Sequence, residues 1–507
     1  MRWTSLLLML CLGAHLAGCG QKPPPTRQTH AIAWREGDVD DALAEARESG
    51  KPVMLYWGAK WCPPCNQIKS TLFKDPAFIA ETDQFIPVHL DGDSPGAQRW
   101  GERFGISGYP TVIVLRPDGS EVTRLSDGAA EQLPGVLRAT AGRTIPIEAL
   151  FDKAQTDSST LSPDEWRLLA AFDWQNDPKH FGDQARAGTL LERLSAAAPD
   201  VELQRRFGLL ALAMEARKGP DGKYTLTSGQ QAALAKVLPA VLANPAEVII
   251  NRQALSDEIP DLVAALPDDA LRAMLGASLV AALDGVYRDE SLPLPDRLGT
   301  VNADITLAKA GSRPLPPAVL AKVQARVAWV DRTAKDAMVR QSVISDAAGL
   351  LHDAGDDAGA KRLLEAELKR SAFPYYYMLD LAGIAEDEKD GPTAIAWARK
   401  AYEAAQGPAT RVQWAIDYSQ TVMRQAPGDK GAVETSADAV IDELGKDNGG
   451  YYQRTRVKVT RWGGLVRAWS RAHDGGTVLG RLDARMAGVC ARQAEAANTC
   501  LQWSQAA

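Results

Sequence analysis

Apolar and polar residues follow two different patterns along the chain, one before about residue 145 and one after it. In the first part, short apolar runs predict four strands: Val53–Trp57, Phe85–Leu90, Thr111–Leu115 and Glu121–Leu125. Segments with helical spacing predict four helices: Asp38–Ser49, Pro63–Phe73, Ala97–Phe104 and Ala129–Ala141. Strands that alternate with helices at this spacing predict an α/β domain over residues 31–145, with helices on both faces of a sheet.

The second part, residues 146–507, is rich in Ala and Leu and has helical periodicity, for example at Val319, Val323 and Val327. Segments rich in proline and glycine separate the expected helices: 218–222, 292–297 and 311–317. Short loops between helices of ordinary length favour antiparallel hairpins stacked side by side. We therefore predict a large all-α region built as an α-solenoid.

A weak internal repeat is present near the middle of this helical region. Pro374 and Pro408 are 34 residues apart, and the acidic turns that precede them share that offset. A helix–turn–helix period of 34 residues resembles tetratricopeptide repeats. We expect tetratricopeptide-like hairpins near 340–445, within a solenoid that is irregular elsewhere because residues 150–310 show no such period.

Charge and length narrow the possible functions. The 507 residues carry 57 Lys and Arg against 64 Asp and Glu, a formal net charge of −7. This balance, without any run of basic residues, argues against nucleic acid as a partner, because phosphate binding needs a concentrated basic face. Beyond the N-terminus, the longest apolar stretch is Ala270–Leu283, which Arg272 interrupts. It predicts a buried amphipathic helix rather than a membrane span of about 20 residues.

The first residues have the features of an export signal. Arg2 is followed by the apolar stretch Ser5–Ala14 and then by Leu16–Cys19, which resembles the lipobox of bacterial lipoproteins. In that family a peptidase cuts before the cysteine, and acyl chains on the cysteine anchor the protein to a membrane. The resemblance implies a signal peptide over residues 1–18 and lipidation of Cys19. An ordinary secretory signal, with an incidental cysteine, is the alternative.

The residues after the signal indicate how the protein is displayed. Residues 19–30, with three consecutive prolines, are too polar to pack and predict a flexible tether. Gly20 replaces the Asp that retains lipoproteins in the inner membrane of Gram-negative cells. The resemblance therefore implies a lipid-anchored protein of the cell envelope, at the outer membrane and facing the periplasm.

Two close pairs of cysteines remain after processing, since Cys11 lies in the signal and Cys19 is assigned to lipid. One pair is Cys62 with Cys65, and the other is Cys490 with Cys500. The envelope outside the cytosol is oxidising, so both pairs are candidates for disulfides.

The first pair lies in Trp61–Cys65, at a predicted strand-to-helix junction, and Gly108–Thr111 stands 45 residues later, before a strand. Together these motifs resemble the thioredoxin family over about 115 residues, and its periplasmic reductant branch most. The resemblance implies a thioredoxin-like fold. It also implies that Pro110 is cis and that the backbone of Tyr109 pairs with an extended substrate segment.

The spacing of this motif suits dithiol chemistry. Cys62 would lie at a helix N-terminus, where free N–H groups and the helix dipole favour the thiolate. We expect Cys62 to be the exposed nucleophile and Cys65, one turn inside, to resolve the mixed disulfide. Pro63 and Pro64 fit the first helical turn and stiffen the dipeptide that tunes the reduction potential. Trp61 would form an apolar wall.

One position departs from the family pattern. Thioredoxins carry a buried Asp six residues before the first cysteine, and here that residue is Tyr56, a poor base at neutral pH. His89, on the neighbouring predicted strand, could replace the proton relay to Cys65, alone or with Tyr56. A His89 that points to solvent is the alternative. Asp91 and Asp93 bracket Gly92 in the loop that follows. Two carboxylates so close also suit catalysis or Ca²⁺ binding, but we expect a solvated turn.

Other roles for the Cys-x-x-Cys motif fit less well. A zinc site needs a second Cys/His pair, and haem attachment needs a His where Asn66 stands. We therefore expect neither metal nor cofactor, and a redox-inert structural bridge remains open. For Cys490 and Cys500, one unbroken helix would hold the residues about 15 Å apart, whereas a bridge needs Cα atoms within about 7 Å. A disulfide there requires a turn, for which Asn498–Thr499 is a weak candidate, so both states stay open.

Taken together, these features predict a lipid-anchored thiol–disulfide oxidoreductase, a protein-disulfide reductase that acts on envelope proteins. Reduction demands an electron donor, such as a membrane-spanning thiol reductase. The alternative is an envelope adaptor or redox sensor. Its helical array would bind a partner protein through aromatic anchors such as Tyr375–Tyr377 and Tyr451–Tyr452, and its thioredoxin-like domain would be a docking module.

Overall fold

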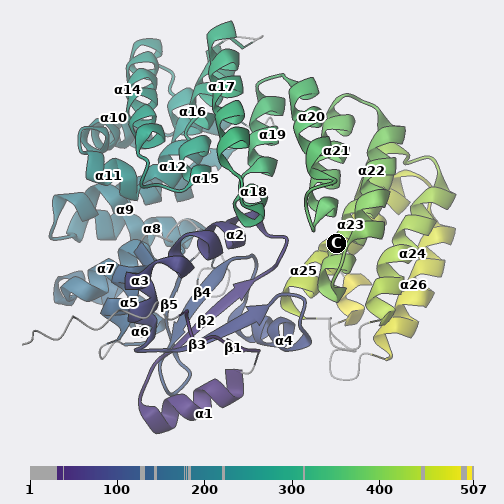
Figure 1. Cartoon of the computed structure of the whole chain (residues 1–507), viewed down its shortest axis with the longest axis horizontal. Coiled ribbons are helices and arrows are strands. Elements are labelled where there is room, and N and C mark those ends of the chain that lie inside the picture. The colour runs from purple at the N-terminus through teal and green to yellow at the C-terminus, as the bar shows by residue number, and fades with distance from the viewer. Residues whose placement is uncertain are drawn as a thin grey trace, which may run out of the picture.

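The computed structural model of the chain describes residues 31–504, with gaps at 38, 126–131, 142–144, 176, 178–179, 181–183, 220–222, 312–314, 447–451 and 493–499. The predicted signal, the tether, the lipidation site Cys19 and Tyr451 lie outside the described residues. Figure 1 shows the α/β domain at one side of the molecule and the helices arranged around it.

The α/β domain is built on a five-stranded sheet with the order β1-β3-β2-β4-β5. The strands are β1 (Arg35–Glu36), β2 (Val53–Gly58), β3 (Ile86–Asp91), β4 (Thr111–Leu115) and β5 (Glu121–Leu125). Strands β1 and β2 run parallel to β3, whereas β4 is antiparallel to β2 and β5 to β4. The four predicted strands are confirmed, and β1 was missed because two residues give no periodic signal.

The domain also contains five helices: α1 (Val39–Ser49), α2 (Pro63–Ser70), α3 (Pro76–Thr82), α4 (Pro95–Phe104) and α5 (Leu133–Thr140). A 3-10 turn at Leu72–Lys74 follows α2, so the predicted helix 63–73 ends early. Helix α3 was not predicted. Asp75 caps its N-terminus by accepting the backbone N–H groups of Ala77 and Phe78.

Helices cover both faces of the sheet, as the sequence pattern predicts. On one face, Leu55 and Trp57 of β2 pack with residues of α1 and α4 such as Leu43 and Trp100. On the other face, the sheet packs with α3 and α5 and then with helices that follow residue 145. Strand β2 is buried along its whole length because it lies between these two layers.

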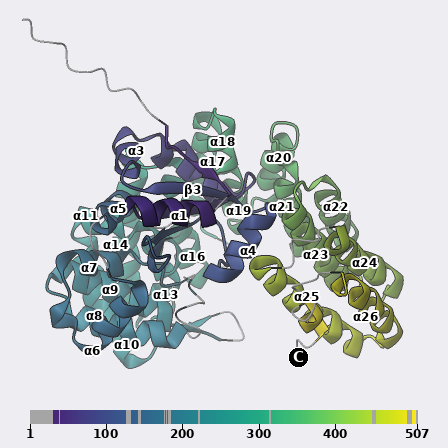
Figure 2. The ribbon, with the colours of Figure 1, turned by 90° about the horizontal axis from the view of Figure 1, so that it is seen from below.

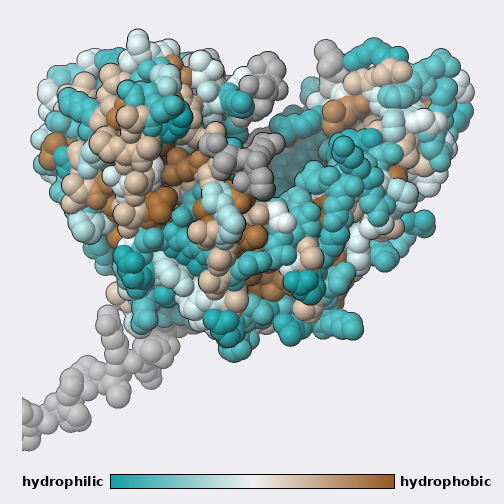
Figure 3. All heavy atoms as spheres, turned by 90° about the horizontal axis from the view of Figure 1, so that it is seen from above, coloured by the Kyte–Doolittle hydropathy of each residue, from teal (hydrophilic) through white to brown (hydrophobic). Residues whose placement is uncertain are grey.

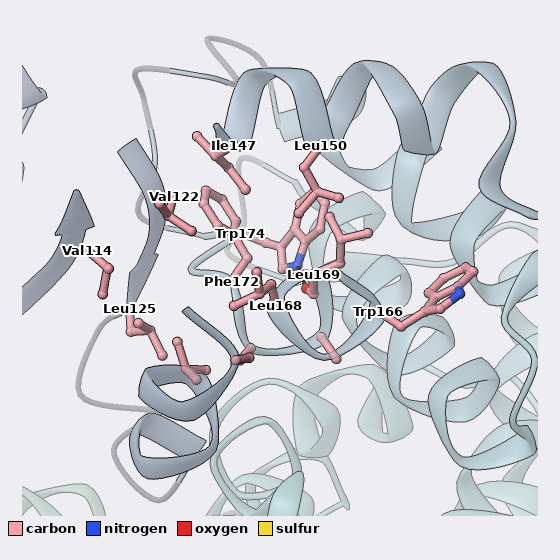
Figure 4. Close-up of a cluster of buried hydrophobic side chains, with 14 of the residues drawn as sticks. Val114, Val122, Leu125, Ile147, Leu150, Trp166, Leu168, Leu169, Phe172 and Trp174 are labelled. Atoms are coloured by element: carbon pink, nitrogen blue, oxygen red, sulfur yellow. Dashed lines mark hydrogen bonds between the residues drawn. The ribbon is translucent and has the colours of Figure 1, made fainter. Parts of the chain in front are cut away.

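The hydrophobic core continues across residue 145, the predicted domain boundary. Helices α6 (Ile147–Thr156) and α7 (Pro163–Ala171) place apolar side chains against Val122 and Leu125 of β5. Figure 4 shows these strand residues facing the side chains that follow in the chain. The same cluster extends to Met214 of α9. The first helices of the C-terminal part therefore share a core with the sheet.

The rest of the chain is helical, which confirms the predicted fold class. The helices are α8 (Gln184–Ala197), α9 (Val201–Glu215), α10 (Ser228–Leu242), α11 (Pro245–Ile250), α12 (Arg252–Asp257), α13 (Ile259–Ala264), α14 (Asp269–Arg288), α15 (Leu294–Gly299), α16 (Asn302–Gly311), α17 (Pro317–Thr333), α18 (Ala337–Gln341), α19 (Ile344–Asp353), α20 (Asp357–Glu367), α21 (Pro374–Asp387), α22 (Gly391–Ala404), α23 (Pro408–Gln425), α24 (Lys430–Lys446), α25 (Gln453–Ala472) and α26 (Gly476–Cys490). A small hairpin of β6 (Arg217–Lys218) and β7 (Tyr224–Thr225) interrupts them at a predicted breaker.

The weak sequence repeat corresponds to a repeated turn. Gly355 and Lys389, 34 residues apart, both have positive φ, 87° and 63°. The next residue in each case, Asp356 or Asp390, caps the following helix with its side chain. The turns before α20 and α22 are therefore equivalent, although a tetratricopeptide-like classification stays a prediction.

Helix α14 is the one described helix that is long and apolar enough to span a membrane, by length and composition alone. One such helix is weak support for a span, because core helices of soluble proteins pass the same test. Its Leu275, Leu279 and Leu283 are buried in the helical core, while Met274 is exposed. This is the amphipathic pattern that the sequence predicts.

The helical array bends around the α/β domain and returns to it. Helix α18 contacts α2, and helix α25 contacts α4. Figures 1 and 2 both show α25 beside α4, far from the place where the array begins at α6. The space-filling view in Figure 3 shows two lobes with a hollow between them. The array therefore contacts the α/β domain near its start, in its middle at α18 and again at α25.

Candidate active site

The Cys62–Cys65 pair lies where β2 leads into α2. Cys62 is the N-cap residue of α2, and Pro63 and Pro64 occupy the first turn, where their missing N–H groups cost no helical hydrogen bond. The two cysteines form a disulfide with Cα atoms 5.3 Å apart. The Cys62 Sγ also accepts the backbone N–H of Cys65 at 3.2 Å. The first sulfur therefore sits at the positive end of the helix, the position that stabilises a thiolate after reduction.

The Tyr109–Pro110 segment lies against this disulfide, as the family resemblance implies. The peptide bond between the two residues is cis. The Tyr109 carbonyl oxygen is 3.7 Å from the Cys62 Sγ. The Tyr109 hydroxyl accepts a hydrogen bond from Gln98 Nε2 at 3.3 Å, and burial raises the pKa of this hydroxyl. The motif near residue 110 and the Cys-x-x-Cys motif thus meet in one site.

The sulfurs of this site are covered, so the prediction that Cys62 is exposed is wrong for this structure. Cys62 is 2% exposed and Cys65 is 0% exposed. The two cysteines belong to an apolar cluster with Ala59 and Trp61, and the other buried members come from the helical array: Tyr375, Ala401, Ala405 and Trp414. The covering residues belong to α21–α23, about 310 to 350 positions further along the chain.

Trp61 of the α/β domain contacts the helical array through both its side chain and its backbone oxygen. Its indole Nε1 donates a hydrogen bond to Thr410 Oγ1 at 2.8 Å, and its backbone oxygen accepts one from Gln341 Nε2 at 3.1 Å. The ring stacks on Tyr376 and meets Trp414 edge to face, with centroids 5.9 and 5.0 Å away. The predicted apolar wall of the active site is therefore packed against the helical array.

Asp93 makes a second polar contact with Thr410, near the start of α23. Its carboxylate accepts the backbone N–H of Thr410 at 2.7 Å and the Thr410 hydroxyl at 2.8 Å. Burial raises the pKa of Asp93, although these hydrogen bonds act against the shift. Gly407 (φ 91°) lies so close that a Cβ there would collide with the Asp93 carboxylate. The prediction of a solvated turn is thus wrong for Asp93, and no local signal in the sequence links this residue to Thr410, 317 positions away.

Cationic side chains of α25 complete the contact. Arg456 forms an ion pair with Glu102 of α4, with Nη2 and Oε1 2.7 Å apart. The Arg454 guanidinium lies over the Tyr109 ring, 4.8 Å from its centroid, and over the Trp61 ring at 5.8 Å. The helical array therefore contributes charge as well as apolar area at the dithiol site.

The proposed relay residues lie side by side, Tyr56 on β2 and His89 on β3. The Tyr56 ring stacks on the His89 imidazole with centroids 5.5 Å apart, and His89 Nδ1 lies 2.9 Å from a carboxylate oxygen of Glu36. Burial raises the pKa of Tyr56, whose hydroxyl has no hydrogen-bond partner among the described residues. The structure pairs His89 with Glu36 rather than with Cys65, and the relay stays a prediction.

Cys490 and Cys500 form the second disulfide, with Cα atoms 5.4 Å apart. Helix α26 ends at Cys490, which removes the obstacle that an unbroken helix would present. The intervening Asn498–Thr499 lies outside the described residues. Both sulfurs are buried in a core with Trp462 and Trp503. Trp462 and Trp469, seven residues apart, both line this core.

The aromatic residues suggested as partner anchors have a different role here. Tyr375 is buried in the cluster around Cys62, and Tyr376 stacks on Trp61. Tyr377 is buried within the array and its hydroxyl donates to Gln341. Tyr375 and Tyr376 therefore contact the chain's own α/β domain, whereas Tyr377 packs within the array. Across residues 31–504 with the gaps given above, no group of three or more His, Cys, Asp or Glu side chains is placed to hold a metal ion.

Comparison with known proteins supports the geometry. Residues 33–117 match the family model described as thioredoxin-like. The fold of this domain is thioredoxin-like. A segment of 112 residues is 30% identical to the thiol:disulfide interchange protein DsbD 1 of Pseudomonas aeruginosa, covering 22% of this chain and 19% of that protein. A segment of 105 residues is 31% identical to DsbD of Cronobacter sakazakii, covering 20% and 18%.

A more distant likeness leads to the same fold. A segment of 116 residues is 24% identical to the protein disulfide-isomerase of Hordeum vulgare, covering 22% of this chain and 21% of that protein. The chain therefore spans about a fifth of the length of each of these relatives. Each match covers about a fifth of this chain, a length close to that of the α/β domain.

Proposed function

We propose that this protein is a thiol–disulfide oxidoreductase that reduces disulfides in other proteins. The carrying observation is the Cys62–Cys65 disulfide at the start of α2, with the Tyr109 carbonyl 3.7 Å from the outer sulfur. A helix N-terminus stabilises a thiolate, and a backbone segment beside it can pair with an extended substrate. The interchange proteins that match this domain support the same chemistry.

The reaction begins with Cys62 as a thiolate and Cys65 as a thiol. The Cys62 thiolate attacks one sulfur of a substrate disulfide, so that a mixed disulfide forms and the other substrate sulfur leaves as a thiolate. Cys65 then loses its proton and attacks the Cys62 sulfur, which releases the second substrate sulfur. The substrate gains two electrons and, when its two thiolates are protonated, two protons, of which Cys65 supplies one and water the other. The protein is left with the disulfide seen here.

We also propose that the protein works as a reductant and that it is located in the cell envelope. Thioredoxin-like reductants of the envelope need a donor of electrons, and we assign that role to a membrane thiol reductase that returns Cys62–Cys65 to the dithiol. The lipobox-like Leu16–Cys19 sequence and the proline-rich tether support a lipid-anchored envelope protein. Replacing Cys19 by Ala should move the protein from the membrane fraction to the soluble fraction. Retention of that variant in membranes would contradict the anchor.

Trapping the mixed disulfide tests the function. In Cys65→Ser, the second step cannot occur, so envelope proteins should accumulate as covalent complexes with Cys62 that reductant dissolves. The matched control is the double variant Cys62→Ser, Cys65→Ser, which retains the fold and lacks the nucleophile. Equal amounts of complex in the two variants, or none in either, would contradict the proposal.

The adaptor alternative has less support. An adaptor needs aromatic anchors that are free to bind a partner protein. Here Tyr375 and Tyr376 pack on the dithiol site of the same chain. Their position connects the helical array to the redox chemistry instead.

A further inference from the structure

The dithiol site and the helical array share one contact surface, here called the seam. It consists of the apolar cluster around Cys62, the hydrogen bonds of Thr410 to Trp61 and Asp93, and the Arg456–Glu102 ion pair. The part of the array that forms it, helices α21–α25, is here called the cover. The inference below concerns regulation of this site and rests on the proposed function.

The closed seam is incompatible with turnover on a protein substrate. Thiol–disulfide exchange needs a third sulfur to approach the Cys62–Cys65 bond in line, and access to sulfur limits its rate. Cys62 is 2% exposed, and the Trp61 ring beside it is packed against Tyr376 and Trp414. The surface on which an extended substrate would lie is therefore occupied by the protein's own helices.

The two ends of the array are attached to the α/β domain in different ways. Helices α6–α9 share one continuous hydrophobic core with the sheet. Gln67 of α2 donates a hydrogen bond to Asp296 of α15. Gln341 of α18 donates one to the backbone oxygen of Trp61. The cover, in contrast, has its own cores within the array and meets the α/β domain at the seam. Because stacked helical hairpins contact mainly their neighbours, small rotations between hairpins add up to a large movement at one end.

We propose that α21–α25 act as an autoinhibitory cover, which is closed over the Cys62–Cys65 disulfide in this structure and must swing away to admit a protein substrate or donor. Thr410 is the latch of this cover, since its hydroxyl bonds Trp61 and Asp93 of the α/β domain at once. The opening separates surfaces and breaks no covalent bond. The cover thus restricts exchange to partners that can open it.

An access measurement tests the cover without relying on turnover. The oxidised full-length protein is treated with a phosphine reductant, and free thiols at Cys62 and Cys65 are alkylated and counted by peptide mass spectrometry. Thr410→Val keeps the shape of the side chain and removes both hydroxyl bonds. We expect reduction of Cys62–Cys65 to be about tenfold faster than in wild type, the factor that corresponds to one charge-assisted hydrogen bond.

A matched control lies on the same helix. Ser419 also accepts a hydrogen bond from a tryptophan indole, that of Trp462 at 3.1 Å, but within the array and away from the seam. Ser419→Ala should leave the reduction rate of Cys62–Cys65 unchanged. Equal acceleration in Thr410→Val and Ser419→Ala, or none in Thr410→Val, would overturn the proposal.

A cross-link tests the movement itself. Glu102→Cys with Arg456→Cys places two partly accessible thiols across the seam, while the four native cysteines stay in disulfides. A short bis-maleimide should join the two new thiols. Compared with the same variant before cross-linking, we expect reduction of Cys62–Cys65 to slow by tenfold or more. Unchanged reduction after cross-linking would show that access does not require the cover to move.

These outcomes also separate the two proposals. If the access measurements give the expected changes but Cys65→Ser traps no substrate, the cover stands and the proposed function fails. If Cys65→Ser traps substrates and the cross-linked protein is reduced as fast as before, the function stands and the cover fails.

Discussion

The two disulfides of this protein are alike in geometry and burial but differ in what surrounds them. Their Cα atoms are 5.3 and 5.4 Å apart, and all four sulfur-bearing residues are at most 2% exposed. Cys490–Cys500 lies inside one core, with Trp462 and Trp503 from the same part of the array. Cys62–Cys65 lies between two parts of the molecule, at a helix N-terminus on one side of the seam.

The difference shows that burial alone does not separate a redox disulfide from a structural one. A disulfide inside one core becomes accessible only when that core unfolds. A disulfide at a seam becomes accessible when two folded parts move apart, which costs the contacts of the seam and leaves both cores intact. The experiments below, from the largest expected effect to the smallest, test this contrast.

The largest contrast should be in turnover. Cys62→Ser removes the attacking sulfur, so disulfide reduction, measured with insulin or another protein disulfide, should fall to the uncatalysed background, about a thousandfold or more. The double variant Cys490→Ser, Cys500→Ser should keep its turnover, because that pair contacts no part of the seam among the described residues. Loss of turnover in a folded Cys490 and Cys500 variant would break the comparison.

For the free energy of unfolding, removal of Cys490–Cys500 should have the larger effect of the two. The Cys490–Cys500 bridge closes a separation of 10 residues and Cys62–Cys65 one of 3. By the loop-entropy relation, removing the former should lower the free energy of unfolding by about 2.7 kcal/mol and removing the latter by about 1.6 kcal/mol. Urea unfolding of the two Ser/Ser double variants measures both. Because each introduces two buried hydroxyls, a larger loss for the Cys62 and Cys65 pair would contradict this account.

The carboxyl groups of Asp380 on α21 and Glu443 on α24 should respond to pH in opposite ways. Burial raises the pKa of Asp380, on the cover helix α21, to about 7. The folded state therefore keeps a proton that the unfolded state releases near pH 4, and this stability is lost as the pH rises towards 7. Between pH 5 and pH 7, wild type should lose about 2 kcal/mol relative to Asp380→Asn, measured by urea unfolding. Parallel profiles for the two proteins would contradict the raised pKa.

Glu443 belongs to α24, the helix whose Val440 and Leu444 pack in the core with Cys490, and it should show the smallest effect and the opposite sign. Burial alone would raise its pKa, but donors from Arg411, Lys446 and Tyr402 outweigh burial and lower the pKa of Glu443 to about 2. Stability from this group is full above about pH 4.5 and is lost as the pH falls towards 2. From pH 5 to pH 3, wild type should lose about 1.7 kcal/mol relative to Glu443→Gln in urea unfolding. A loss on the alkaline side instead would contradict the sign.

Sequence patterns predicted the local features of this protein well. The strands Val53–Trp57 and Thr111–Leu115 gave a clear signal because they are apolar throughout and end at turn residues. The Cys-x-x-Cys motif and the Tyr109–Pro110 segment identified the candidate site, since each motif has a fixed place in a thioredoxin-like fold. Strand β1 and helix α3 were missed because they are two and seven residues long.

The seam could not be predicted, because nothing local marks its members. Thr410 is an ordinary residue near the start of a helix, and Asp93 resembles a residue of a polar turn. Their pairing depends on the sum of many small angles between successive hairpins over some 300 residues. A short window of sequence does not contain that information. For the same reason, Tyr375 and Tyr376 could be recognised as aromatic contacts but not assigned to a partner.

Because the hydrophobic core is continuous across residue 145, it decides which part of this protein can fold on its own. A fragment that ends at residue 145, the predicted domain boundary, would leave Val122 and Leu125 without the side chains of α6 and α7. Such a fragment would present a bare sheet face and associate with itself rather than remain monomeric. The smallest autonomous unit extends to the end of α9 at Glu215, so redox domains from other proteins cannot simply be exchanged into this architecture.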